Sequence, residues 1–343
     1  MRVAVYYNNK DIRVEEMPIP SIGPGELLVK IHSSGICGSD VMEWYRIHKA
    51  PLVLGHEIAG EVVEVGDGVK SFKEGDRVTA THHVPCFTCR YCLGGHETVC
   101  DTLLSGTHFD PGGFCEYVRL PAINVDRGTW KLPEEMSYDE ATFVEPIACV
   151  LRGQRMAGLR PAQSILVLGS GISGVLFISL AKALGVGRIV ATDVSEYRLN
   201  AARRFGAEHT LQAGQNIPVV FREINGGFGA DVVVVATGAE SAVEQALQSV
   251  ERGGVILFFA PTMKGVTIPL SVNDLFWRRD VTLTTTYGGS PADCVNALEL
   301  IRAKRIQVQD MITRYFGLAG TVEGFKLVEK GDESIKVIIR PQE

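Results

Sequence analysis

The chain has 343 residues, of which 45% are hydrophobic and 22% are charged, and its formal net charge is −6 at pH 7. This composition is typical of a globular enzyme, and the length exceeds what one hydrophobic core usually organises, so we expect two domains. The acidic charge balance predicts no nucleic-acid partner. No apolar run is long enough to cross a membrane, and the chain opens directly into a strand pattern without a signal peptide. We therefore expect no membrane partner.

The first part of the chain, up to about residue 135, is predicted to be rich in β-strands. Short alternating or β-branched runs are separated by turns that contain glycine and proline, as in a small barrel or sandwich. A helical pattern, interrupted by Pro146, then covers residues 137–156. The predicted strands are residues 3–7, 27–33, 57–65, 76–80 and 115–120.

A regular alternation of strands and helices follows. It predicts an α/β fold in which helices cover both faces of a parallel sheet. The tail, residues 312–340, returns to short strands that end at 335–339, and we expect it to complete the first domain. The predicted strands of the alternating part are 165–168, 188–192, 231–236, 254–259 and 281–285, and its predicted helices are 175–184, 195–205, 240–250 and 291–303.

The first strand of this alternation ends in a G-x-G-x-x-G motif, formed by Gly169, Gly171 and Gly174. In such a turn the first glycine permits the tight bend, the second lets the backbone approach a pyrophosphate, and the third lets the helix pack against the strand. The N–H groups at the start of the helix, around Ile172 and Ser173, are suited to bind phosphate oxygens. The motif predicts a dinucleotide site.

An acidic residue, Asp193, ends the next predicted strand about 20 residues after the third glycine, where a carboxylate can accept hydrogen bonds from a ribose. A carboxylate there repels a 2′-phosphate, so the sequence favours NAD over NADP. Arg198 leaves an alternative open, because a nearby arginine can accommodate that phosphate. Its other interpretation is a solvated charge on the following helix.

Four of the eight cysteines form a cluster with short spacings: Cys86, Cys89, Cys92 and Cys100. In a chain without a secretory signal this pattern predicts metal binding before disulfides, and a reducing, cytoplasmic location. Four thiolates suit a closed, structural zinc site, which does no chemistry because it has no open position. A zinc ribbon that binds nucleic acid is an alternative, which the acidic charge balance disfavours.

A second, open metal site is needed for chemistry. Cys37 follows one predicted strand, while His56 and Glu57 lie at the start of the next, and Glu145 could add a carboxylate. These donors suit zinc. The residues alone leave two other interpretations open, a cysteine that packs as a small hydrophobe and a His–Glu pair at the surface.

Five landmarks in the same order give the sequence a resemblance to the zinc-dependent medium-chain dehydrogenases, which include alcohol, sorbitol and threonine dehydrogenases. The resemblance extends over essentially the whole chain. It implies a GroES-like, β-rich catalytic domain at residues 1–150 and 290–343, and a Rossmann domain with a doubly wound parallel sheet at 151–289. The landmarks are GICGSD at 35–40, GHE at 55–57, the cysteine cluster at 86–100, Glu145-Pro146 and the glycine turn at 169–174.

The resemblance also implies roles for individual residues. Cys37 and His56 are expected to be zinc ligands, while Glu57 and Glu145 share the remaining protein position in a division that stays open. Ser39 is expected to accept the proton of the substrate hydroxyl. The members of the family often continue this relay with a histidine at the place that Met42 occupies here, and a thioether cannot transfer a proton.

The function implied is the reversible oxidation of a secondary alcohol to a ketone, with hydride transfer to NAD in an active site between the domains. Two zinc ions per subunit, one catalytic and one structural, are expected. The resemblance favours a polyol or sugar as the small-molecule substrate, with L-threonine as the alternative, in a homotetramer or homodimer. A hypothesis of another class is an NAD-binding zinc protein that acts as a redox sensor without turnover.

Overall fold

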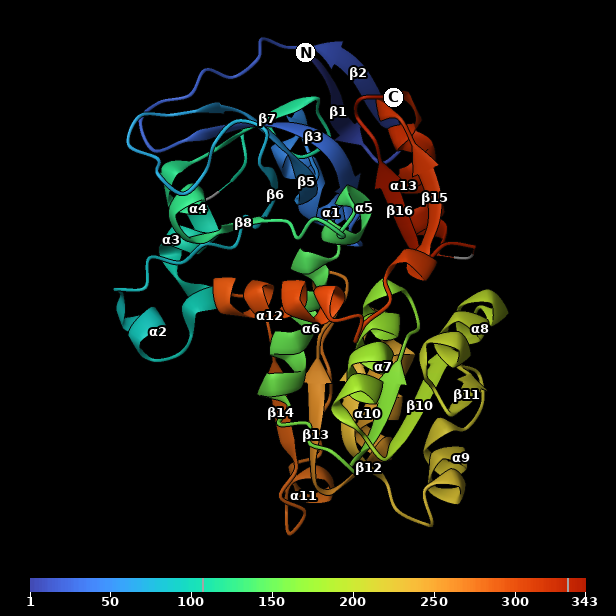
Figure 1. Cartoon of the computed structure of the whole chain (residues 1–343). Helices are drawn as coiled ribbons and strands as arrows, with labels where there is room; N and C mark the ends of the chain where they lie inside the picture. The colour runs from blue at the N-terminus through green and yellow to red at the C-terminus, as the bar shows by residue number, and fades with distance from the viewer. Residues whose placement is uncertain (107, 332) are drawn as a thin grey trace. The chain divides into compact units, whose positions relative to one another are not determined.

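The computed structural model describes residues 1–343 except for residues 107 and 332. The chain forms two compact units, one made of residues 1–149 and 288–343 and the other of residues 150–287 (Figure 1). Among the described residues, no helix combines the length and apolar character that a membrane crossing requires.

The first unit is built mainly from β-strands. Its larger sheet has seven strands in the order β15-β16-β3-β5-β6-β8 with β7 beside β3, and its smaller sheet has the order β2-β1-β4. All of these strand pairs are antiparallel except β15–β16. The strands are β1 (Arg2–Asn8), β2 (Asp11–Glu16), β3 (Leu27–Gly35), β4 (Leu52–Val53), β5 (Glu57–Val65), β6 (Arg77–Ala80), β7 (Tyr117–Leu120), β8 (Thr129–Lys131), β15 (Ile312–Phe316) and β16 (Lys336–Ile339).

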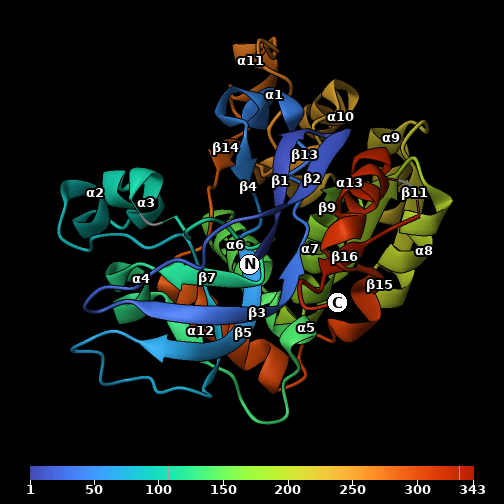
Figure 2. The same cartoon turned by 90° about the horizontal axis from the view of Figure 1, so that it is seen from above.

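The helices of this unit are mostly short and connect the strands. One of them, α13, lies beside β15 and β16 in both views (Figures 1 and 2). The helices are α1 (Glu43–Arg46), α2 (Arg90–Leu93), α3 (Asp101–Ser105), α4 (Ala122–Arg127), α5 (Tyr138–Ala141), α12 (Pro291–Arg302) and α13 (Thr321–Lys330), together with α6 (Val144–Met156), which continues into the second unit.

Two predictions for this part of the chain are wrong in detail. Short strands were the expectation throughout 312–340, but α13 occupies ten residues there. Its buried face includes Phe325, and Gly331 ends it in the left-handed conformation that terminates helices. Pro146 does not interrupt a helix, because it lies in the first turn of α6, where the missing N–H costs nothing. The break lies before α6, between it and α5.

The second unit contains a six-stranded parallel sheet in the order β11-β10-β9-β12-β13-β14. This order reverses direction at β9, as in a doubly wound fold, so the predicted fold class is confirmed. Its elements are β9 (Ser164–Leu168), α7 (Ile172–Leu184), β10 (Arg188–Asp193), α8 (Glu196–Phe205), β11 (His209–Gln212), α9 (Ile217–Ile224), β12 (Ala230–Val235), α10 (Glu240–Ser249), β13 (Val250–Phe258), α11 (Val272–Leu275) and β14 (Thr282–Thr285).

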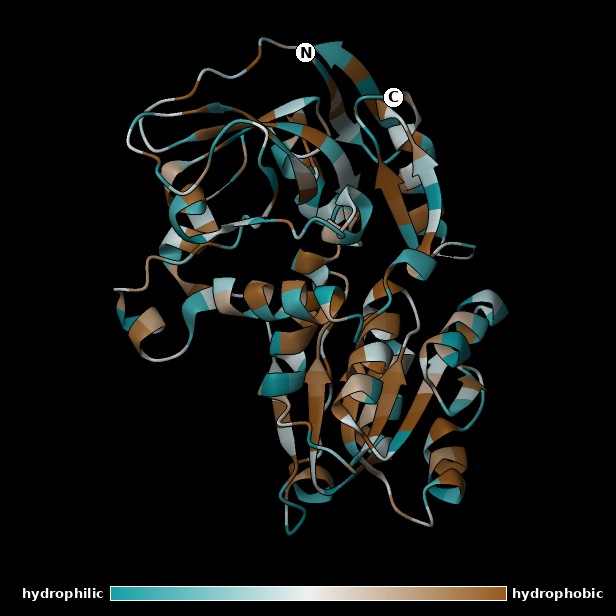
Figure 3. Ribbon diagram, viewed as in Figure 1, coloured by the Kyte–Doolittle hydropathy of each residue, from teal (hydrophilic) through white to brown (hydrophobic). Residues whose placement is uncertain are grey.

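Helices cover both faces of this sheet. Leu166 and Leu168 of β9 pack in one core cluster with residues of α9 and α10. Alternate residues of a strand point to opposite faces, so Ile165 and Val167 face the other side, where α7 contacts β9 and β10. The central strands are hydrophobic along their length (Figure 3), because a parallel strand that is covered on both sides has no polar face.

The glycine turn between β9 and α7 has the geometry that its sequence predicts. Gly169 has φ +96°, a conformation that side chains disfavour, and Gly171 is the N-cap residue of α7. A Cβ atom on Gly174 would overlap the carbonyl oxygen of Gly169, so the helix can approach the strand this closely only with glycine there. The helix begins at Ile172, three residues before the predicted start.

We expect Gly174→Ala to lower the free energy of unfolding by about 1–3 kcal/mol, because the added methyl group would overlap the carbonyl oxygen of Gly169. Gly214→Ala is the matched control, since a Cβ atom on Gly214 meets nothing within 4 Å. Urea denaturation of both variants measures the difference. Equal stability of the two variants would contradict this account of the turn.

Candidate functional site

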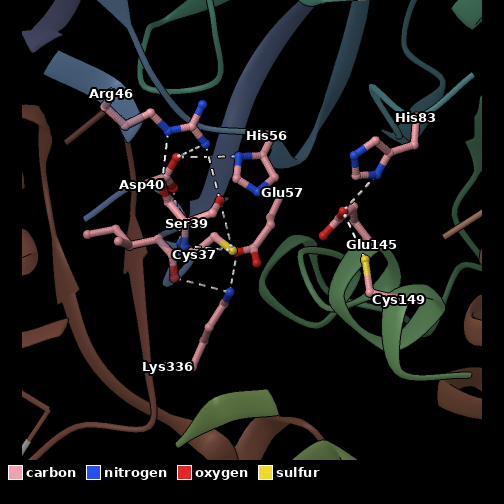
Figure 4. Close-up of polar contacts among 11 residues, drawn as sticks. Cys37, Ser39, Asp40, Arg46, His56, Glu57, His83, Glu145, Cys149 and Lys336 are labelled. Atoms are coloured by element: carbon pink, nitrogen blue, oxygen red, sulfur yellow. Dashed lines mark hydrogen bonds and ion pairs between the residues drawn. The ribbon is translucent and has the colours of Figure 1, made fainter. Parts of the chain in front are cut away.

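The register of β3 and β5 brings the predicted ligands of the open metal site together. Gly35, the last residue of β3, lies opposite Glu57, the first residue of β5. Cys37 follows one strand and His56 precedes the other, so both lie at the same end of the pair (Figure 4). One ligand atom from each of Cys37, His56 and Glu57 lies within 4.8 Å of the others. This is a separation that one metal ion can bridge with modest side-chain adjustment.

Asp40 holds the imidazole of His56. The Asp40 side chain is fully buried, and its Oδ1 lies 3.4 Å from Nδ1 of His56. Its Oδ2 accepts a hydrogen bond of 3.0 Å from the backbone N–H of Cys37. Burial opposes protonation of His56, but the charge and hydrogen bond of Asp40, together with the neighbouring Cys37, raise the pKa of the imidazole well above its usual value. The Asp40 contact fixes Nδ1 and leaves Nε2 as the donor for a metal.

Glu57 forms an ion pair with Lys336, the first residue of β16. Both side chains are almost completely buried, with exposed fractions of 1% and 0%. Lys336 also donates a hydrogen bond of 3.4 Å to the carbonyl of Ile36. Burial raises the pKa of Glu57, and the charge of Lys336 opposes that rise. A Cβ atom on Gly35 would collide with both charged groups, so glycine makes room for the pair.

Ser39 lies between Cys37 and a guanidinium. Its Oγ is 3.4 Å from Sγ of Cys37 and accepts a hydrogen bond of 3.2 Å from Nη2 of Arg46. Nε of Arg46 also donates to the carbonyl of Ser39 at 2.9 Å. The hydroxyl is therefore held beside the cysteine sulfur.

Glu145, on α6, belongs to a different group of side chains from the one around Cys37. Its donor atom lies within 4.8 Å of donor atoms of His82 and His83, which follow β6. Oε1 of Glu145 is 3.1 Å from Nδ1 of His83 and accepts a hydrogen bond of 3.2 Å from Sγ of Cys149. Burial opposes its ionisation, but the contact with His83 lowers the pKa of Glu145 to about 2.

The cysteine cluster is compact. Sγ of Cys86 is 4.0 Å from that of Cys92 and 3.5 Å from that of Cys100, and Sγ of Cys89 is 3.5 Å from that of Cys92. A tetrahedral zinc site with bonds of 2.3 Å separates its sulfurs by about 3.8 Å, so the four thiols fit the ion. Hydrogen bonds from Thr88, with a further one from the Cys89 N–H, lower the pKa of Cys86 to about 5, which favours the thiolate that binds zinc.

In the second unit, Asp193 lies at the end of β10 beside the glycine turn. Its carboxylate accepts hydrogen bonds from the N–H groups of Ser170 at 2.8 Å and Ser195 at 2.9 Å, one on each oxygen. The guanidinium of Arg198 lies 3.7 Å from the place where a side chain on Gly171 would begin. The structure thus brings Asp193 and Arg198 together at the turn, where the N-terminus of α7 suits a phosphate.

Four residues that were not predicted from the sequence take part in the groups around Cys37 and Glu145. Asp40 and Lys336 support ligands, while His82 and His83 contribute donor atoms of their own. Asp40 belongs to the GICGSD segment, so its motif was a signal that could have found it. Lys336 could not be found in this way, because only the pairing of β16 with β3 brings it to Glu57.

Sequence profiles of two families match the chain. The profile described as "Alcohol dehydrogenase GroES-like domain" matches residues 23–134, and the one described as "Zinc-binding dehydrogenase" matches residues 174–303.

Curated relatives match along almost the whole chain. Sorbitol dehydrogenase of Mus musculus is 32% identical over 98% of this chain and 94% of that protein. L-threonine 3-dehydrogenase of Bacillus licheniformis is 33% identical over 95% of this chain and 94% of that protein. Among solved structures, 2R,3R-butanediol dehydrogenase from Bacillus subtilis has a TM-score of 0.84 at 30% identity and covers 99% of each chain.

We expect Lys336→Met to lower the free energy of unfolding by about 3–5 kcal/mol, because it leaves the Glu57 carboxylate buried without its cation. The double variant Lys336→Met/Glu57→Gln should recover most of this loss, since it removes both charges. Chemical denaturation of the protein without bound metal measures both effects. A double variant no more stable than the single one would show that the ion pair is not what the lysine contributes.

Proposed function

Because this chain belongs to the zinc-dependent medium-chain dehydrogenases, we propose that it oxidises a secondary alcohol to a ketone reversibly, with NAD as the hydride acceptor. The single observation that carries the proposal is the group formed by Cys37, His56 and Glu57, whose donor atoms lie within 4.8 Å of one another. A sulfur, an imidazole and a carboxylate form an open zinc site, with a position left for a substrate.

The residues fit the two zinc ions that the family resemblance implies, one catalytic and one structural. Cys37, His56 and Glu57 would hold a catalytic zinc ion, with Glu145 nearby, and the four clustered cysteines would hold a structural one. When bound, Zn²⁺ supplies Lewis acidity toward the substrate oxygen and the nicotinamide accepts the hydride. Asp40 orients His56 through Nδ1, and Lys336 balances the charge of Glu57.

Ser39 is the residue that we propose to contact the substrate hydroxyl. Arg46 donates to its Oγ, which turns the serine hydroxyl hydrogen toward Cys37 and leaves a lone pair to accept from the substrate. Neither Arg46 nor Met42 can accept the proton onward. The relay beyond Ser39 therefore differs from one that continues through a histidine at position 42.

A polyol or sugar is our proposed substrate class, because the named relatives include sorbitol and butanediol dehydrogenases. The family resemblance also implies that Glu145 stands where the alcohol dehydrogenase branch has a cysteine ligand. L-threonine is the second candidate, supported by the threonine dehydrogenase relative at 33% identity. A redox sensor without turnover is less well supported, because a sensor does not need a hydroxyl such as that of Ser39 beside the zinc ligand Cys37.

We also propose a homodimer or homotetramer in the cytoplasm. β14 is the last strand of its sheet and pairs only with β13 among the described strands, which leaves an edge that a second copy can extend. None of the described cysteines forms a disulfide, as in a reducing compartment. Light scattering of the purified protein measures the oligomeric state, and a monomer would contradict this proposal.

We expect Cys37→Ser and His56→Ala to lower turnover by at least about 100-fold, more than the 10–100-fold typical of residues that only support a ligand. NADH binding should persist, because the glycine turn is untouched. The measurements are NADH absorbance with sorbitol, xylitol, myo-inositol, 2,3-butanediol and L-threonine, and NADH fluorescence for binding. The control is His209→Ala, an exposed histidine in the second unit. Near-normal turnover in either site variant would refute the zinc assignment.

We expect Asp193→Gly to shift the ratio of kcat/KM for NADP against NAD by about tenfold toward NADP, because it removes the charge that repels a 2′-phosphate. Asp193→Asn separates charge from geometry, since the amide oxygen can still accept one of the two backbone hydrogen bonds. If both variants keep the original ratio, Asp193 does not determine the choice of cofactor.

A further inference from the structure

One thiol of the first unit contacts a carboxylate of the metal site without being a predicted metal ligand. Glu145 lies in the first turn of α6, and the family resemblance gives it a share of the catalytic metal position with Glu57. Cys149 lies four residues later on the same helix, and residues four apart share one face of a helix. Its Sγ donates a hydrogen bond of 3.2 Å to Oε1 of Glu145.

A second side chain contacts the same oxygen of Glu145. Nδ1 of His83 lies 3.1 Å from Oε1, so this oxygen is held both from α6 itself and from the segment that follows β6. Only 6% of the surface of Glu145 is exposed, and little water competes for these contacts. The other oxygen, Oε2, is directed toward the side chains around Cys37 (Figure 4).

The carboxylate of Glu145 interacts electrostatically with the predicted ligands His56 and Glu57. Burial raises the pKa of Glu57, and the charge of Glu145 raises it further, while the charge of Lys336 opposes both. Burial also acts to raise the pKa of Glu145, but the contact with His83 and the charge of His56 lower it to about 2. Glu145 thus lies close to the ligands with which it would share a metal position.

A single contact on Oε1 would leave the direction of Oε2 undetermined. The last torsion of a glutamate side chain is broad and two-fold, so the carboxylate can turn about one anchored oxygen. The hydrogen bond from Cys149 ties Oε1 to the helix that carries Glu145, and this second anchor removes most of that freedom. Loss of a residue that orients a ligand in this way typically costs about 10–100-fold in metal affinity or activity.

We propose that Cys149 is a positioning residue for the catalytic metal. Its thiol, together with His83, holds Oε1 of Glu145 and presents Oε2 to the metal position that Glu145 shares with Glu57. Cys149 acts through Glu145 and is not itself a ligand. This role rests on the catalytic zinc site of the proposed function, but it does not depend on which alcohol is the substrate.

The test measures zinc binding and needs no turnover. Equilibrium dialysis against buffers of graded free Zn²⁺, followed by elemental analysis, should show two ions per subunit in the unaltered protein. We expect Cys149→Ala, and likewise the bulkier Cys149→Val, to need about 10–100-fold more free Zn²⁺ to bind the second ion, because Glu145 loses an anchor. Cys149→Ser should recover most of this loss, since a hydroxyl can donate in place of the thiol.

Cys115→Ala is the matched control. Cys115 is another buried thiol of the first unit, but its Sγ donates to backbone carbonyls, those of Gly112 at 2.8 Å and Tyr117 at 2.9 Å. Its removal deletes a thiol donor that does not contact a predicted ligand, so both ions should bind as in the unaltered protein. Circular dichroism and NADH binding verify that each variant is folded.

Three results would overturn the role of Cys149. The first is an unchanged zinc affinity in Cys149→Ala and Cys149→Val. The second is a loss in Cys149→Ser as large as that in Cys149→Ala, because the donor would then not be what the thiol contributes. The third is an equal loss in Cys115→Ala, which would indicate general destabilisation. A count of one ion in the unaltered protein at every free Zn²⁺ concentration would instead contradict the proposed catalytic site itself, and this role with it.

Discussion

The pairing of β3 with β5 is the constraint on which the candidate site depends. It places Gly35 opposite Glu57. Cys37 follows β3 and His56 precedes β5, so both lie at the same end of the strand pair. A shift of register by one residue would turn Glu57 to the opposite face of the sheet. The absence of a side chain at Gly35 completes the arrangement, because the space that a Cβ atom would fill contains the ion pair of Glu57 with Lys336.

The buried carboxylates of the two groups around Cys37 and Glu145 each have a partner within the protein. Asp40 faces His56 and Arg46, Glu57 faces Lys336, and Glu145 faces His83. Each buried carboxylate thus has a cation or an imidazole beside it, which reduces the cost of removing it from water. The contact with Asp40 also fixes Nδ1 of His56 and leaves Nε2 to face a metal. Such support by neighbouring residues gives a metal site its geometry.

The fold was largely predictable from local patterns. Apolar β-branched runs that alternate with helical patterns predicted the parallel sheet, and the glycine turn marked its first crossover. α13 was missed because its residues were interpreted by analogy with the strand-rich start of the chain. The glycine turn, with Asp193 beside it, and the cysteine cluster are local in sequence, so their residues could be named before the structure was known.

The sequence by itself determined the kinds of donor atom and the motifs that present them, because short spacings and glycine positions are properties of the chain alone. Only the tertiary structure decided which donors meet. It put Glu57 with Cys37 and His56, and it put Glu145 with His82 and His83. It also brought Lys336 from the end of the chain to a carboxylate almost at its beginning. Contacts of this kind depend on strand pairing between distant segments, and no local pattern records which segments will pair.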